Sequence, residues 1–446
     1  MIGGHTLRNY AETLEYIHSV KWQGSKPGLE RTRELLAALG NPEKSLRFVH
    51  IAGTNGKGAT AACIAAVLRR AGYRTGMYIS PFVVRFNERM QVDGEYITDD
   101  ELITLTEEIR PFADAMADSP TEFELITALA MLFYLRKRCD IVVLEVGMGG
   151  ELDSTNVIDA PEVAVITTIG YDHVRELGPT LADIARAKAG IIKDGGDVVT
   201  YGSYDATPEV ESVFERVCLE RGARLRRADF SRISDYTFSL DGSSFRFEPY
   251  GTIALPLVGT YQPCNAAVAI TALETLREKG YNISDSDIVA GLASVRWPGR
   301  FEVLGRDPVF ILDGTHNPQG IEVTAESLRR HFGDRKIVFL VGFMADKDVD
   351  AILRHIAPMA EAFVAVRPDH PRAMDVRTLA NMISRHGVAV SVGETIGAGV
   401  ADAIAIAGRG GIVCAVGSLY FSADVRDGYA AATQHTSPHI AAVFAG

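Results

Sequence analysis

The sequence has little of what marks secreted, membrane-spanning or nucleic-acid-binding proteins. Its five cysteines lie scattered over 446 residues without a CxxC pair, which argues against a disulfide framework or a structural zinc site. No apolar run is long enough to span a bilayer, and the start shows no apolar stretch after basic residues, so we expect no signal peptide. The net charge of −12 argues against a nucleic-acid or anionic-membrane surface. We therefore expect a cytoplasmic monomer that binds neither nucleic acid nor membrane.

What the sequence does contain is an alternation of short apolar runs with longer helical patterns. Strands are predicted over 45–52, 73–80, 140–147, 162–170 and 197–202, and helices over 57–71, 99–110, 122–137 and 180–193. This alternation is typical of βαβ units and a mostly parallel sheet covered by helices on both faces. Residues 232–258 alternate polar and apolar around a DG turn, which predicts a small antiparallel hairpin region before a helix near 262–278.

The chain is long for a single core, so two domains are expected. RWPGR at 296–300 interrupts the pattern with Pro and Gly, and we place the boundary there, giving domains 1–297 and 298–446. Beyond it the strand patterns resume with VFILDG, KIVFLVGFM, AFVAVRP, VAVSVG and GIVCAVGSLYF. The predicted fold class is α/β, with a mostly parallel sheet in the larger domain and a smaller, Rossmann-like C-terminal domain.

The strongest local motif joins the first predicted strand to the first long helix. It consists of Gly53, Thr54, Asn55, Gly56, Lys57 and Gly58. Glycines let backbone N–H groups surround a phosphate, the following helix N-terminus adds positive potential, and Lys57 would contact the β- and γ-phosphates of a nucleotide. The Ser or Thr that usually follows the lysine of such a loop is replaced by Gly58, so a Mg²⁺ ligand must come from another segment. The alternative interpretation is a glycine-rich turn that binds nothing.

This loop resembles that of the Mur ligase superfamily, and further segments resemble the folylpolyglutamate synthase / dihydrofolate synthase family. They are KPGLERTRELLAALGNP (26–42), SPFVVRFNERMQVDGEYI (80–97), LEVGMGGELDSTNVI (144–158), DHVRELGPTLADIARAKAGIIK (172–193), WPGRFE (297–302), LDGTHNPQG (312–320) and GSLYFSADVR (417–426). The resemblance covers nearly the whole chain in order. It implies a Mur-ligase-like P-loop ATPase domain followed by a glutamate-ligase domain.

The resemblance also implies a reaction. ATP would phosphorylate a carboxylate of tetrahydrofolate, and the amine of L-glutamate would attack the resulting acyl phosphate. Whether dihydropteroate is a second acceptor is left open. Two other classes of protein are considered. The first is another Mur-type amide ligase, but the residues before Gly53 leave no room for the N-terminal domain that such ligases usually carry. The second is a P-loop ATPase or regulatory nucleotide-binding module, which would need no second domain.

The site residues are carried over from the same resemblance. One Mg²⁺ is expected on Ser80, Glu145 and His173, and a second on Lys188 as a carbamate. Lys57, Lys188 and His316 are the expected catalytic residues, and Asn265, Arg300 and Asp313 join the phosphate loop in binding ATP. Without the resemblance, each has a plainer interpretation: Glu145 as a capping or ion-pair carboxylate, His173 as structural, Arg300 as a surface charge, Asp313 as a turn cap and Lys188 as a helix-surface lysine.

Four residues differ from the usual pattern of this family. Ala59 stands in place of Ser or Thr, Phe82 in place of a His after Ser-Pro, Glu151 in place of Arg, and Tyr261 in place of His. Phe82 and Glu151 lie near regions that handle the pterin substrate or the phosphate loop, so the preferred pterin is left open.

Overall fold

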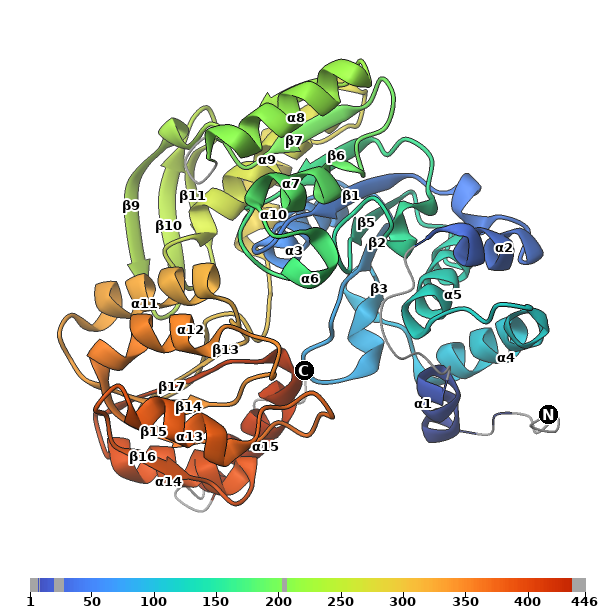
Figure 1. Ribbon diagram of the computed structural model, residues 1–446. Helices are drawn as coiled ribbons and strands as arrows, with labels where there is room; N and C mark the ends of the chain where they lie inside the picture. The colour runs from blue at the N-terminus through green and yellow to red at the C-terminus, as the bar shows by residue number, and fades with distance from the viewer. Residues whose placement is uncertain (1–6, 8, 20–27, 203–206, 435–446) are drawn as a thin grey trace.

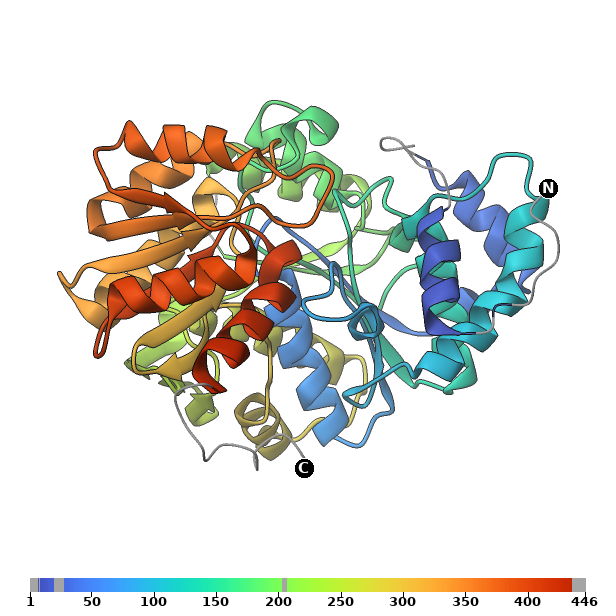
Figure 2. The ribbon, with the colours of Figure 1, turned by 90° about the horizontal axis from the view of Figure 1, so that it is seen from below.

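The structure is a computed structural model that describes residues 7, 9–19, 28–202 and 207–434. Both predicted domains therefore extend beyond the described residues, as does the start of the first resembling segment. Two sheets covered by helices lie side by side, and a three-stranded antiparallel sheet flanks them (Figure 1). Seen from below, the six-stranded sheet and its helices again form a layered unit beside the larger sheet (Figure 2).

The larger sheet has eight strands in the order β4-β3-β2-β5-β1-β6-β7-β8. They are β1 (Phe48–Ala52), β2 (Thr75–Tyr78), β3 (Met90–Val92), β4 (Glu95–Tyr96), β5 (Ile141–Glu145), β6 (Val163–Ile166), β7 (Asp197–Thr200) and β8 (Arg224–Arg227). All neighbours from β2 to β8 pair in parallel, whereas β3 and β4 add an antiparallel edge. The five predicted strands of this region are confirmed, and the short β3, β4 and β8 were not predicted.

Helices cover both faces of this sheet. One face carries α1 (Tyr10–Ser19), α2 (Glu30–Ala38), α4 (Asp99–Ala115), α5 (Glu122–Arg136), α7 (Leu181–Ala189) and α8 (Pro208–Glu220). The other carries α3 (Lys57–Arg70), α9 (Gln262–Glu278) and α10 (Asp285–Ala293). Helix α4 continues through Pro111 beyond its predicted end, and α7 ends before its predicted end. Thr98 and Thr121 begin α4 and α5 with capping boxes, which satisfy backbone N–H groups of the first turn.

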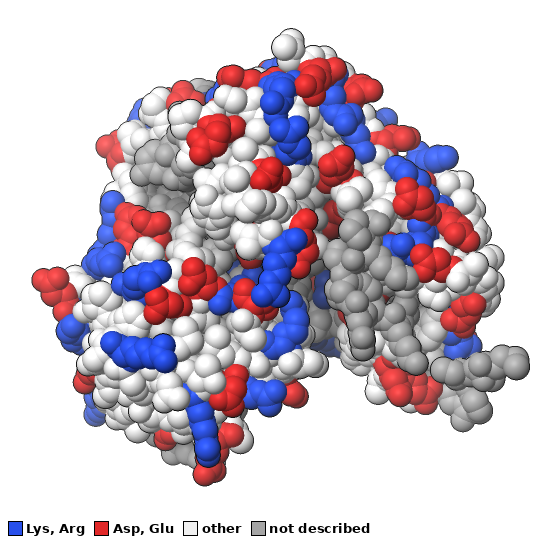
Figure 3. All heavy atoms as spheres, viewed as in Figure 1, with Lys and Arg blue, Asp and Glu red and all other residues white. Residues whose placement is uncertain are grey.

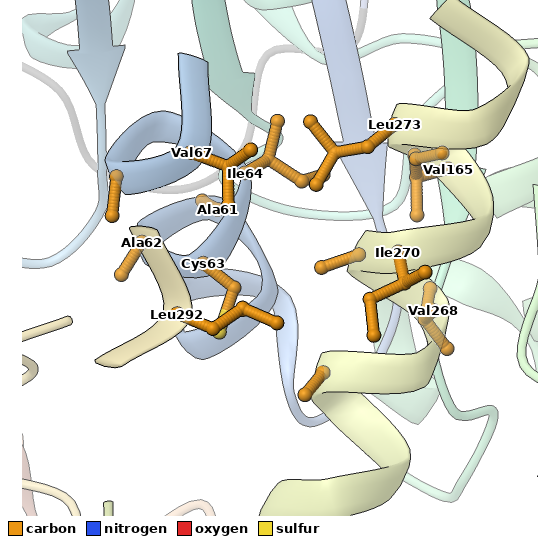
Figure 4. Packing of buried hydrophobic residues seen from close by; sticks show 14 of the residues in the cluster. Ala61, Ala62, Cys63, Ile64, Val67, Val165, Val268, Ile270, Leu273 and Leu292 are labelled. Atoms are coloured by element: carbon orange, nitrogen blue, oxygen red, sulfur yellow. The ribbon is translucent and has the colours of Figure 1, made fainter. Parts of the chain in front are cut away.

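Helix α3 is the centre of the first core. Its Ala61, Ile64 and Val67 pack against Leu273 of α9 and Leu292 of α10 (Figure 4). The small side chains let the three helices approach closely, and the buried cluster continues onto the sheet. Because α3 directly follows the phosphate loop, this packing fixes the loop to the hydrophobic core.

The smaller six-stranded sheet has the order β12-β13-β17-β14-β15-β16. Its strands are β12 (Glu302–Arg306), β13 (Val309–Asp313), β14 (Ile337–Val341), β15 (Ala360–Ala365), β16 (Val390–Val392) and β17 (Ile412–Val416), and only β12 pairs antiparallel. One face carries α11 (Pro318–Phe332), α12 (Val349–Ile356) and α13 (Val376–Ser384), and the other α14 (Ile396–Ala407) and α15 (Ser422–Gln434). This confirms the predicted Rossmann-like arrangement.

The hairpin region predicted at 232–258 is a three-stranded meander. It consists of β9 (Ile233–Ser239), β10 (Gly242–Phe247) and β11 (Gly251–Leu255). The remaining short helices are α6 (Val174–Leu177), η1 (Pro42–Ser45), η2 (Phe86–Arg89), η3 (Ser154–Val157), η4 (Phe230–Arg232), η5 (Ala357–Met359) and η6 (Leu419–Phe421). None of the described helices is both long and apolar enough to cross a membrane. Acidic and basic side chains are interspersed on the face shown in Figure 3.

Candidate active site

A cavity of about 760 Å³ lies between the two sheets, at the ends of their parallel strands. Open α/β sheets bind ligands at this edge. The cavity brings together most of the predicted site residues. They are Gly53, Thr54, Asn55, Gly56, Lys57, Gly58, Ser80, Glu145, His173, Lys188, Asn265, Arg300 and His316. Asp313 is the one predicted site residue that does not line it.

The phosphate loop connects β1 to α3, as predicted. Gly56 has a φ of 84°, a conformation that side chains disfavour, and a Cβ there would collide with Asn265. Lys57 is the first residue of α3, and its Nζ donates to the carbonyls of Gly53 at 3.2 Å and Thr54 at 3.3 Å. The same Nζ lies 3.9 Å from a carboxylate oxygen of Glu145. The loop thus holds its lysine pointing back over its own backbone, where an incoming phosphate would lie.

The glycine that replaces the usual Ser or Thr has a packing reason. A Cβ at Gly58 would overlap the ring of Trp297, which comes from the connection between the two sheets. Thr60, two residues on, is fully buried, so it does not compensate. The two positions after Lys57 and the buried Thr60 therefore offer no hydroxyl group to a metal, and the expectation that the ligands come from other segments stays a prediction.

Glu145 and Ser80 meet at the ends of neighbouring strands. Glu145 is the last residue of β5, and its Oε2 accepts a hydrogen bond of 3.3 Å from the backbone N–H of Ser80, which follows β2. Burial raises the pKa of Glu145, and the charge of Lys57 lowers it in turn. A buried carboxylate of this kind is a natural partner for a cation.

His173 lies across the cavity in a left-handed backbone conformation with a φ of 51°. Burial lowers its pKa to about 4, although the neighbouring carboxylate of Asp172 opposes the shift. Its imidazole is therefore neutral near pH 7 and has a lone pair for a metal. In the part of the chain that the structure describes, no three His, Cys, Asp or Glu side chains cluster as a metal site. The expected set has only two such residues, because Ser80 and a modified Lys188 complete it.

Lys188 is buried on α7, so it is not a helix-surface lysine. Its Nζ donates a hydrogen bond of 2.8 Å to the carbonyl of Gly53, the first residue of the phosphate loop. Burial, helped by the charge of Lys57, lowers its pKa to about 7. Near neutral pH a large fraction of this amine is uncharged, which is the form that reacts with carbon dioxide.

Asp172 connects the two halves of the site, a role that the sequence analysis did not predict. Its Oδ1 forms an ion pair of 2.6 Å with Nζ of Lys347, and its Oδ2 accepts a hydrogen bond of 3.2 Å from Asn317. The imidazole Nε2 of His316 is 3.7 Å away. Burial alone would raise the pKa of Asp172, but the adjacent imidazole of His316 and the ammonium of Lys347 hold it well below its usual value. This carboxylate follows β6, whereas its partners come from the segments after β13 and β14.

Side-chain amides complete the contact between the two halves of the site. Asn55 of the phosphate loop donates to Gln319 at 2.9 Å and accepts from Asn317 at 3.0 Å. Gln319 in turn donates to the carbonyl of Ile169 at 3.1 Å. Asp313 instead lies fully buried behind this contact, where its Oδ2 accepts a hydrogen bond of 2.7 Å from Thr324. It therefore supports the segment that carries His316.

One end of the cavity is aromatic, which the sequence reasoning did not single out. Tyr201 and Phe230 lie edge to face, with ring centroids 4.9 Å apart, and Tyr236 lines the same end. Trp297 closes the side next to Gly58. Flat apolar surfaces of this kind suit the base of a nucleotide whose phosphates lie on the loop.

The family match agrees with this geometry. Residues 51–273 match the Mur ligase middle domain, and residues 299–419 match the Mur ligase glutamate ligase domain. The chain belongs to the Mur ligase family.

Three similar proteins narrow the place of the chain within this family. A Bacillus subtilis dihydrofolate synthase/folylpolyglutamate synthase is 36% identical over 435 residues, covering 94% of this chain and 98% of the relative. A Mycobacterium tuberculosis folylpolyglutamate synthase, solved with ADP and AMPPCP, superposes with a TM-score of 0.86 at 30% identity over 94% of this chain and 98% of that one. Escherichia coli FolC, solved with DHPP and ADP, gives 0.84 at 29% identity over 96% and 99%. Within the Mur ligases, the chain thus groups with the folylpolyglutamate and dihydrofolate synthases.

Proposed function

We propose that this protein is an ATP-dependent ligase that joins L-glutamate to tetrahydrofolate through an acyl phosphate. The relatives named folylpolyglutamate synthase support the reaction, and the cavity supports its chemistry. The observation that carries the proposal is the juxtaposition of a phosphate loop with Lys57 and a buried carboxylate, Glu145, inside one cavity between two sheets. Dihydropteroate is the second candidate acceptor, because the relatives' names include dihydrofolate synthase.

The chain's own groups provide charge and alignment. Nucleotide phosphates would lie on the loop, with Lys57 contacting the β- and γ-phosphates and Asn265 next to Gly56. Arg300 and His316 face them from the other side of the cavity. The acceptor carboxylate attacks the γ-phosphorus and ADP leaves; the glutamate amine then attacks the acyl carbon, phosphate leaves and the amine loses a proton. Such a reaction depends on positioning and on charge stabilisation more than on a protein nucleophile.

Mg²⁺ is expected with this nucleotide, and the residues present fit it. Glu145 is buried and at the cavity wall, His173 is neutral near pH 7, and Ser80 adjoins Glu145. These three residues would hold one ion, which would neutralise negative charge on the phosphates. ATP, L-glutamate and a reduced folate or dihydropteroate would be the small-molecule partners.

Lys188 is assigned as the carbamate that completes a second Mg²⁺ site. The ammonium first loses a proton; carbon dioxide then adds to the neutral amine, a second proton is released from nitrogen, and the product is an anion with two oxygen ligands. The burial of Lys188 and its position in the cavity wall support this assignment. We expect Lys188→Ala to be severely impaired and short carboxylic acids to restore part of its activity. Full activity in Lys188→Ala without added acid would contradict the assignment.

The domain boundary near residue 297 also belongs to this proposal. It is supported by the sheets, since all strands of the smaller sheet begin at or after Glu302. Nucleotide would bind between the domains, whose closure would exclude water from the acyl phosphate. A monomer in the cytoplasm is the expected state, and size-exclusion chromatography with light scattering tests the monomer.

The decisive experiment measures ADP release by the purified protein with ATP, Mg²⁺ and L-glutamate. Tetrahydrofolate and dihydropteroate are supplied separately as acceptors, and the products are identified by mass spectrometry. ADP release that requires tetrahydrofolate and glutamate together supports folylpolyglutamate synthesis, and release with dihydropteroate adds the second activity. ADP release that is independent of both acceptors would indicate a plain ATPase instead.

A further inference from the structure

Arg89 lies at the edge of the larger sheet where the candidate active site is built. It is the last residue of η2, directly before β3, and its carbonyl accepts a hydrogen bond of 3.1 Å from the N–H of Ile79. Ile79 precedes Ser80, so Arg89 stands beside the strand end that carries this expected metal ligand. Burial raises the pKa of Glu145, and the charges of Lys57, Arg300 and Arg89 each lower it.

The guanidinium of Arg89 has no anionic partner. The residue is only 9% exposed, its Nε lacks a hydrogen-bond partner, and across residues 7, 9–19, 28–202 and 207–434 it forms no hydrogen bond or ion pair through its side chain. Its contacts are with two rings, 5.3 Å from the centroid of Phe82 and 5.6 Å from that of Phe86. Rings attract a cation and fix its plane, but they leave its N–H groups unsatisfied.

A half-buried arginine of this domain shows the contrast. Arg31 of α2 donates from Nε and Nη2 to the two carboxylate oxygens of Glu124, at 3.0 and 2.9 Å. A buried charge is costly unless it is paired. Arg31 meets that condition within the chain, and Arg89 does not.

Among the described residues, no acidic side chain forms an ion pair or hydrogen bond with Arg89. Neighbouring Glu88 is fully occupied, since its oxygens accept hydrogen bonds from the backbone N–H groups of Val83, Val84 and Arg85. Of the segments outside the described residues, 1–6, 20–27 and 435–446 contain neither Asp nor Glu, and 203–206 contains Asp205. The described residues thus leave Arg89 open to an anion from outside the chain.

The side of the sheet on which Arg89 lies indicates which reactant this is. Lys57 and α3 lie on one face of the larger sheet. The nucleotide would bind on this side, at the phosphate loop and the aromatic end of the cavity. Phe82 and Phe86 belong to the cluster on the opposite face. The acceptor is the other anion that must reach Glu145, and it combines an aryl group with carboxylates. A planar guanidinium matches a carboxylate, and ring faces match an aryl group.

We propose that Arg89, held against Phe82 and Phe86, binds a carboxylate of the acceptor substrate. The assignment rests on the proposed function, because it takes the acceptor to be an aromatic carboxylate such as tetrahydrofolate. It makes Arg89 a substrate-binding residue that acts on acceptor affinity rather than on the nucleotide. It also explains why the chain keeps an unpaired buried cation at this edge.

The test compares Arg89→Met with Arg31→Met, each in the full-length protein. Thermal unfolding is followed without ligand, with ADP and with tetrahydrofolate, and KM is measured for each substrate. Arg89→Met should be at least as stable as the wild type without ligand, because it removes an unpaired charge, and should keep the stabilisation by ADP. It should lose the stabilisation by tetrahydrofolate and raise the acceptor KM by roughly 10- to 100-fold, as expected for a hydrogen bond to a charged group. Arg89→Lys should have an acceptor KM between those of the wild type and Arg89→Met. Arg31→Met should lower the unfolding temperature.

Three results would overturn the assignment. An Arg89→Met protein that is less stable without ligand and has an unchanged acceptor KM would make Arg89 a structural residue. Lost stabilisation by ADP would place it in the nucleotide site. A wild-type protein that releases no ADP with either acceptor would contradict the proposed function, whereas acceptor-dependent release that Arg89→Met matches would contradict the Arg89 assignment alone.

Discussion

The two walls of the cavity are built in different ways. The phosphate-loop wall is held by backbone: the N–H of Thr54 donates to the carbonyl of Thr168 at 2.7 Å, and Gly56 fixes the turn into α3. The opposite wall is joined to it through side chains: the amides of Asn317 and Gln319 contact Asn55 of the loop, and the ammonium of Lys347 contacts Asp172. A wall made of backbone is in place before any ligand arrives. A wall joined by a few side chains can separate and return, so we expect motion to be concentrated there.

Lys57→Ala should have the largest effect, because it removes the only side-chain charge that the phosphate loop supplies. We expect kcat/KM for ATP to fall by about 1,000-fold or more, the scale of losing one positioned charge-stabilising group. The fold should be unchanged, since the backbone still shapes the loop. ADP release checks the rate, circular dichroism checks the fold, and Lys44→Ala, at an exposed lysine, is the control. A nearly normal rate in Lys57→Ala would remove the basis for the phosphate-loop assignment.

Glu145→Gln and His173→Ala test whether Mg²⁺ is bound by residues of the phosphate-loop wall. Each should lower activity at ordinary Mg²⁺ by about 100-fold or more, because the loss of even an outer-shell partner of a metal ligand costs roughly 10- to 100-fold. Glu145→Gln keeps the side chain's size and removes its charge. Metal dependence is measured by titrating Mg²⁺ into chelator-treated protein. A nucleotide-bound structure with Mg²⁺ on Thr60 and Glu145 remote from it would refute this assignment.

Lys347→Met tests the opposite wall. It breaks the ion pair with Asp172 that joins the segments after β14 and β6. Because breaking a buried pair leaves an unpaired charge, we expect a loss of roughly 10- to 100-fold in activity, with a larger average separation of the two sheets in solution. Small-angle X-ray scattering with and without ADP measures that separation. Lys336→Met, at an exposed lysine whose Nζ contacts the carbonyl of Pro358, should change neither property.

The smallest effect is expected at His50, inside the rigid wall. It lies fully buried on β1, and its Nε2 is 2.9 Å from the hydroxyl of Thr155, which itself donates to Asp153 at 2.5 Å. The hydroxyl can therefore only accept from His50, so the imidazole is neutral with its proton on Nε2. Burial lowers its pKa from 6.5 to about 3.

The direction in which stability changes with pH follows from proton uptake. Between pH 6.5 and about 3 the unfolded chain binds a proton at His50 that the folded protein does not, so stability falls as pH falls through this window. The contribution is on the order of 4 kcal/mol in the free energy of unfolding. His50→Gln should flatten that part of the stability profile while leaving activity near pH 7 almost unchanged. Urea unfolding at several pH values measures the profile, and an equal slope in both proteins would contradict the assignment.

The sequence predicted the features that depend on neighbours along the chain. The phosphate loop is one strand, one turn and one helix, so residues 53–58 carried its whole signal. Resemblance added Arg300 and His316 of the opposite wall, which both line the cavity. Asp172 could not be ranked in this way, because its importance comes from Lys347, 175 positions away. Arg89 was not predicted either. It stands out because it is buried without an anionic partner among the described residues, and only the three-dimensional structure shows that.

The contact between Gly58 and Trp297 gives this protein an optical reporter. The chain has two tryptophans, and this one stands between the phosphate loop and the connection to the second sheet. Its emission should change both when a nucleotide fills the cavity and when the sheets move relative to each other. A Trp22→Phe protein would report from Trp297 alone, so stopped-flow fluorescence could time binding and closure without an added dye.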